Sequence, residues 1–130
     1  MSATSKLTSV VIAAALTLAL PMSAMAHEAT KGPNGGALVD VEGHHVEFVP
    51  SASELTFYLT GEKDAPIASA GAKAKAIVQD NGKTAQIDLS AVEPNMLVGK
   101  LAAPLSSGAK VVVTGSLSDG HGLQARFESP

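Results

Sequence analysis

The sequence contains no cysteine and no tryptophan, and it has only three phenylalanines and one tyrosine. Without cysteine the chain forms no disulfide, offers no thiol nucleophile and cannot hold Cys-ligated zinc or an iron–sulfur cluster. The scarcity of aromatic side chains excludes a base-stacking platform for single-stranded nucleic acid. Nine Lys and Arg against twelve Asp and Glu give a net charge of −3, which excludes a basic nucleic-acid-binding surface as well.

The start of the chain has the three parts of a secretory signal peptide. Lys6 is the only charged residue before Glu28, residues 7–20 form an apolar run, and Ala24-Met25-Ala26 is an Ala-x-Ala cleavage site. The apolar run is short for a membrane span, and no other segment approaches the length needed. We therefore expect residues 1–26 to be a signal peptide. The mature protein is then periplasmic, begins at His27 and has no membrane span.

Most of the mature chain alternates apolar and polar residues, which is the period of a β-strand. The full 130-residue sequence has 45% hydrophobic and only 16% charged residues, which excludes a disordered, charge-driven chain and suits one domain. We expect a flexible polar arm over residues 27–36 and an all-β domain over residues 37–130. About seven or eight short strands between Gly, Pro and Asn turns predict a single antiparallel β-sandwich, Ig-like or cupredoxin-like.

One segment of the domain is ambiguous. The alanines of residues 68–80 favour a helix by propensity, but residues 72–76 alternate strictly and Asn81-Gly82 is a strong hairpin signal. We predict a hairpin of about residues 72–80 with 83–89. The predicted inner face of the sheet carries these residues: Val46, Phe48, Leu55, Phe57, Leu59, Ile87, Leu89, Leu97, Val111, Val113, Leu123 and Phe127.

Histidine is the residue type best suited to chemistry here. If cleavage follows Ala26, His27 offers its α-amine and an imidazole nitrogen to one metal ion. Cleavage after Ala24 instead makes His27 the third residue, which can close a square-planar site with the amine and two backbone amides. His121 lies in a glycine-flanked turn two residues after Asp119. This carboxylate and imidazole can share a cation, or the acid can orient the ring.

The adjacent residues His44 and His45 must point to opposite faces of their strand. His44 shares the inner face with Val46 and lies at the mouth of the strand. His45 shares the outer face with Glu47, and this pair, about 6.5–7 Å apart, suits one surface ion. Because they face opposite ways, at most one of the two histidines can serve any single ion.

Motifs of catalysis are missing. The sequence has no nucleophile elbow, P-loop, dinucleotide fingerprint, His-x-x-x-His pair or EF-hand loop, so we expect no enzymatic activity. Only Met96 remains after signal removal, which argues against a methionine-rich Cu(I) carrier. The candidate ligands of a divalent transition metal, Cu(II), Zn(II) or Ni(II), are histidines and carboxylates: His27, His44, His45, Glu47, Asp119 and His121.

Each of these candidates also fits an ordinary solvated or hydrogen-bonded residue. If no metal binds, the alternative function is a non-catalytic envelope module that binds a protein partner through an edge strand.

Two segments carry a resemblance to a known group of proteins: Gly32-Pro33-Asn34-Gly35-Gly36 and His44-His45-Val46-Glu47-Phe48-Val49. With the strand Leu55-Thr56-Phe57-Tyr58-Leu59, they resemble small periplasmic β-sandwich domains associated with heavy-metal efflux systems. Some of those domains stand alone, and others form the amino-terminal part of membrane-fusion subunits. The resemblance covers most of residues 32–128. It implies a role in heavy-metal resistance, with a periplasmic efflux component as a partner.

The helical hairpin and lipoyl-like domain of fusion subunits are absent from the sequence. The position of His27 is also similar to the mature amino-terminal histidine of periplasmic copper carriers with a cupredoxin-like sandwich.

Overall fold

The computed structural model describes residues 30–130. The predicted signal peptide and His27 lie outside the described residues. A short 3₁₀ turn, η1 (Glu62–Asp64), lies between strands β4 and β5. Within residues 30–130 the strands are β1 (Thr30–Lys31), β2 (Ala37–Val41), β3 (His44–Pro50), β4 (Glu54–Thr60), β5 (Lys73–Asp80), β6 (Lys83–Val92), β7 (Met96–Lys100), β8 (Lys110–Ser116) and β9 (Gly122–Glu128).

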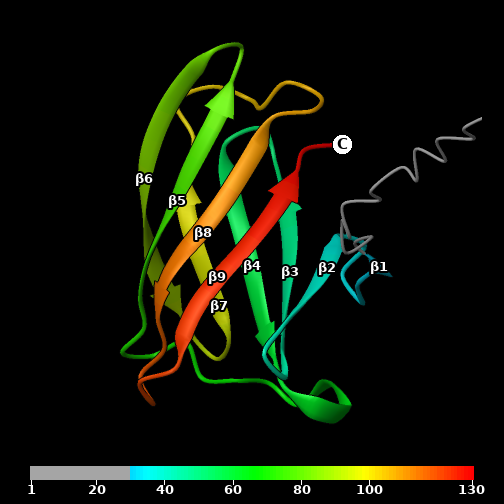
Figure 1. Cartoon of the computed structure of the whole chain (residues 1–130), viewed down its shortest axis with the longest axis vertical. Helices are drawn as coiled ribbons and strands as arrows, with labels where there is room; N and C mark the ends of the chain where they lie inside the picture. Colours follow the sequence, from blue (N-terminus) through cyan, green and yellow to red (C-terminus); the bar gives the residue numbers. More distant parts are fainter. Residues whose placement is uncertain (1–29) are drawn as a thin grey trace, which may run out of the picture.

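All strand pairs of the described region are antiparallel, which confirms the prediction of an all-β antiparallel domain. The pairing runs through one sheet in the order β1-β2-β3-β4-β7-β6-β5-β8-β9. Figure 1 shows this sheet curled into a half-barrel. The two separate sheets of the expected sandwich are therefore not what the pairing shows.

The long strand β6 is the physical reason for the continuous sheet. Its residues 83–89 pair with β5, whereas its residues 90–92 pair with β7. One strand thus belongs to both halves of the fold, and the sheet bends along it instead of splitting. Alternation of apolar and polar residues predicts each strand but cannot show that one strand changes partner along its length.

The hairpin predicted from Asn81-Gly82 is confirmed. Both turn residues have positive φ, 50° and 76°, as a tight hairpin turn requires. Strand β5 occupies the ambiguous alanine-rich segment, and its neighbour β8 approaches it closely. A Cβ at Gly115 of β8 would lie 2.1 Å from the carbonyl oxygen of Lys73, so this position has no room for a side chain.

The core lies inside the curl of the sheet. Every residue predicted for the inner face is buried except Ile87, which is half-buried and packs against the others. Phe127 of β9 meets Phe48 of β3 and Phe57 of β4, with ring centroids 5.2 Å and 5.8 Å apart. The last strand therefore packs over the early strands, and this places the two ends of the sheet order near each other.

Strands β2 and β9 face each other along the line where the half-barrel is not closed by backbone pairing, and we call this line the seam (Figure 1). The two strands lie in contact, but no backbone pairing joins them in the region that the structure describes. Within residues 30–130, no helix is long and apolar enough to cross a membrane.

Candidate metal centre

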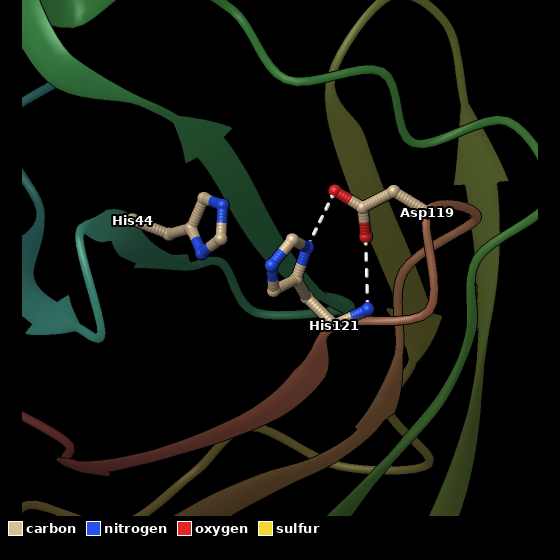
Figure 2. A group of neighbouring side chains, drawn as sticks. All are labelled: His44, Asp119 and His121. Carbon is tan, nitrogen blue, oxygen red and sulfur yellow. Dashed lines mark hydrogen bonds and ion pairs between the residues drawn. The ribbon is translucent and has the colours of Figure 1, made fainter.

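Three of the predicted ligands meet at one end of the seam. His44 is the first residue of β3, whereas Asp119 and His121 lie in the turn between β8 and β9. One donor atom from each residue can be chosen so that all three lie within 4.8 Å of one another. Figure 2 shows the His121 ring between the His44 ring and the Asp119 carboxylate.

The turn that carries Asp119 and His121 is held by its own backbone. The Leu117 N–H donates to the His121 carbonyl at 2.9 Å, and the Gly120 N–H donates to the Leu117 carbonyl at 3.0 Å. Gly120 has a φ of +90°, a conformation that glycine adopts at no steric cost. The predicted Asp-Gly turn therefore forms, and it presents the carboxylate and the imidazole on the same side.

Asp119 holds His121 through two hydrogen bonds. Its Oδ2 lies 2.8 Å from Nδ1 of the His121 ring, and its Oδ1 accepts from the His121 backbone N–H at 2.9 Å. These contacts lower the pKa of the Asp119 carboxyl below its ordinary value, first through the backbone hydrogen bond and then through the ring. The carboxylate thus stays ionised beside the ring.

This arrangement orients the other ring nitrogen of His121. When Nδ1 donates its proton to Asp119, Nε2 keeps its lone pair for a metal, and the carboxylate increases the basicity of the ring. In Figure 2 that nitrogen is turned towards His44. The His44 and His121 ring centroids are 5.3 Å apart with an interplanar angle of 66°. Two imidazoles can therefore meet one ion, with Asp119 behind His121 or as a third ligand.

The three residues are exposed enough for a metal ion to bind from solvent and to be released again. His44 is half-buried, whereas the Asp119 and His121 side chains are 49% and 60% exposed. Two nitrogen donors and one carboxylate match the ligand preferences of Cu(II), Ni(II) and Zn(II). Three ligands leave at least one coordination position for water or another donor.

His45 does not join this group. It follows His44 on β3 and faces the opposite way, as the strand period requires. Its Nδ1 is buried and has no hydrogen-bond partner. The structure therefore separates the adjacent histidines and brings only His44 to Asp119 and His121.

We predicted that Glu47 is a surface metal ligand beside His45, and the structure corrects this prediction. The residue is only 1% exposed. Its carboxylate accepts from the Gly36 N–H at 2.8 Å, from the Asn34 N–H at 2.9 Å and from the Asn34 side-chain amide at 3.0 Å. The turn over residues 32–36 covers this part of β3 and uses both carboxylate oxygens. Glu47 is therefore a structural anchor for the residues before β2.

The sequence analysis missed two partners, Asn34 and Gly36, that lie in the expected flexible arm. The sequence offered one indication of this contact. The backbone N–H groups of the turn residues in the arm need a hydrogen-bond acceptor, and a nearby carboxylate can supply it. A Cβ at Gly32 would lie 2.3 Å from the Glu47 carboxyl carbon, which explains the glycine there. His27 lies outside the described residues.

Comparison with known proteins gives no match to a family model, to a curated protein or to a solved structure. The geometry of His44, Asp119 and His121 is therefore the feature of the described residues that bears on function.

Proposed function

We propose that this chain is an exported, periplasmic metal-binding protein that holds a divalent transition metal with His44, Asp119 and His121. The observation that supports this proposal is the convergence of three donor groups within 4.8 Å from two segments far apart in the sequence. Cu(II) is the preferred ion because it stands highest in the affinity order of divalent metals for nitrogen ligands, followed by Ni(II) and Zn(II).

The role that fits this site is metal binding or transfer. A partly exposed ion with an open coordination position can be received and released, whereas a buried four-ligand site holds its metal permanently. The resemblance of residues 32–128 to domains associated with heavy-metal efflux systems supports this role. The same resemblance suggests a periplasmic efflux component as the protein partner to test.

Export is tested by the intact mass of the protein recovered from the periplasm. Cleavage after Ala26 predicts a mass that begins at His27. A product that retains Lys6 contradicts both the export and the free amine at His27.

Metal binding is tested by calorimetric titration of the protein that begins at His27, with Cu(II), Zn(II) and Ni(II) in turn. We expect His44→Ala and His121→Ala each to weaken Cu(II) binding about tenfold or more, because each removes a nitrogen ligand. His45→Ala is the matched control: the same substitution, one residue away, on the other face of β3. It should leave the affinity unchanged.

If none of the three ions binds more tightly than to free histidine, the proposal is wrong. The alternative, an envelope interaction module, then takes its place. The observation that favours that alternative is strand β9, which pairs with β8 alone along residues 122–128 and leaves its other edge without a paired strand among residues 30–130.

A further inference from the structure

The three ligands of the proposed site come from two separate turns at one end of the sheet. His44 directly follows the turn between β2 and β3, whereas Asp119 and His121 lie in the turn between β8 and β9. In the part of the chain that the structure describes, β3 and β9 are not paired, so no strand ladder holds one turn against the other. The curl of the sheet brings the two turns together.

Each turn is formed by its own residues. The β2–β3 turn consists of Glu42 and Gly43, which have φ values of +48° and +84°, and Val41 pairs with His44 across it. Positive φ at both central residues is what a tight two-residue hairpin requires. The β8–β9 turn is closed by its own backbone and side-chain hydrogen bonds. The donors are therefore preformed in two parts, one imidazole on the first turn and an imidazole with its carboxylate on the second.

Contact between the two turns is limited. The His44 and His121 rings meet edge to face with centroids 5.3 Å apart, but within residues 30–130 no hydrogen bond or ion pair joins the turns. The aromatic packing of β9 lies at its other end, where Phe127 contacts rings of β3 and β4. Buried rings therefore hold the far end of β9, whereas the β8–β9 turn meets the start of β3 through two imidazoles.

We infer that metal binding is coupled to the contact between these two turns: the bound ion holds the turns together, and separation of the turns releases the ion. The inference rests on the proposed metal site. With the turns together, one ion can contact both imidazoles and the Asp119 carboxylate. With the turns apart, the larger set left on one turn is His121 with Asp119, so the affinity is lower. A ligand that prefers one of two states shifts the population towards that state.

The coupling gives the proposed role in metal transfer a release step. Because coupling between two equilibria is reciprocal, a contact that favours the separated turns weakens metal binding by the factor with which metal opposes separation. A receiving protein that binds the separated turns therefore takes the ion without protonating the histidines. The exposure of the Asp119 and His121 side chains, 49% and 60%, makes the β8–β9 turn accessible to such a contact.

Hydrogen exchange followed by NMR, with and without diamagnetic Zn(II), tests whether the ion holds the turns together. Without metal, the β9 amides that pair with β8 should exchange faster than those of β5, an interior strand paired on both sides. Zn(II) at about 100 times its dissociation constant should slow these β9 amides about 100-fold, because separation must first release the ion. The amides of Asn81 and Gly82, at the opposite end of the molecule, should not change (Figure 1).

Two variants show whether the protection comes from the proposed site. His121→Ala removes a ligand, so Zn(II) should no longer slow exchange at β9. His45→Ala makes the same substitution next to His44, on the other face of β3, and should keep the full effect.

Substitutions in the core test the reverse effect, of the packing on the metal. Leu123 is 3% exposed and is the first buried residue of β9 after the turn, whereas Leu97 is fully buried in β7. Leu123→Ala should weaken Zn(II) binding about tenfold, because it loosens β9 beside the turn. Leu97→Ala is the matched control and should leave the affinity unchanged. Circular dichroism verifies the fold, and the two Leu→Val variants, with the same order of affinities, replace the pair if either alanine variant is unfolded.

The outcomes separate the coupling from the proposed site. The coupling is wrong if β9 exchanges no faster than β5 without metal, if bound Zn(II) leaves exchange at β9 unchanged, or if the Leu123 and Leu97 variants bind Zn(II) equally. In each of these cases the site itself stands, provided that His44→Ala and His121→Ala weaken binding in calorimetry. If those two substitutions leave the affinity unchanged, the proposed site is wrong and the coupling fails with it.

Discussion

The rings of His44 and His121 lie 5.3 Å apart between centroids, although His44 begins β3 and His121 directly precedes β9, the third and ninth strands in the order of the sheet. A path from β3 to β9 that follows backbone pairing must pass through five other strands: β4, β7, β6, β5 and β8. Their contact therefore depends on the curl of the sheet and lies at one end of the seam. An ion bound there joins two parts of the fold that no backbone hydrogen bond links within residues 30–130.

Metal binding should weaken as the pH falls below about 6. An imidazole nitrogen must be unprotonated to coordinate a metal, and histidine protonates near this pH. Cu(II) titrations at a series of pH values from 7.5 to 5 measure the effect (roughly the range in which imidazole changes charge). An affinity that is independent of pH across this range contradicts histidine ligation.

Without metal, the pKa of Asp119 should lie below the ordinary carboxyl value of 3.8, because the His121 backbone and ring both stabilise the carboxylate. Its contribution to stability is then fully present above 3.8 and is lost as the pH falls through the lowered value. In His121→Ala the backbone N–H remains and the ring is absent, so the pKa should rise part of the way back. NMR titration of the carboxyl carbon measures both values, and an equal pKa in the two proteins contradicts the ring contact.

Glu47→Gln should destabilise the protein by about 2 kcal/mol or more. The substitution keeps the size of the side chain but turns a buried carboxylate into an amide, whose NH₂ group faces the donors of Asn34 and Gly36. Urea unfolding followed by circular dichroism gives the change. Glu54→Gln, on an exposed residue at the start of β4, is the matched control and should change stability by less than about 0.5 kcal/mol.

Phe127→Ala should cost about 3–5 kcal/mol, because it removes a buried ring that contacts Phe48 and Phe57 across the interior. The exposed Val92→Ala provides the comparison, since Val92 is 40% exposed and should change stability by less than about 0.5 kcal/mol. Equal unfolding midpoints for the two variants would show that β9 does not pack on the early strands.

Gly115→Ala should destabilise the protein by about 1–3 kcal/mol, because its Cβ would lie 2.1 Å from the Lys73 carbonyl oxygen and β8 would have to move away from β5. Gly122→Ala, at the start of β9, meets no atom within 4 Å and should be tolerated. Thermal unfolding of both variants decides whether the close approach of β5 and β8 is correct.

The local features of this protein follow from its sequence. Leu55, Phe57 and Leu59 alternate with polar residues because a strand with one buried face needs that period, and Asn81-Gly82 turns the chain because both residues tolerate positive φ. The side-chain period also separates His44 from His45 before any strand is placed. The Asp-Gly turn likewise keeps Asp119 next to His121, since the two are close in the chain.

Only the tertiary structure decided which of these local features meet. Glu47 has the alternation of an exposed strand residue, yet the turn over residues 32–36 covers it, and no pattern within β3 carries that information. β6 changes partner along its length, and this bends a single sheet into a half-barrel where alternation alone predicts a sandwich. That bend brings the β8–β9 turn to the start of β3. His44 meets Asp119 and His121 because distant residues converge through strand order and curvature, which the period of a sequence does not encode.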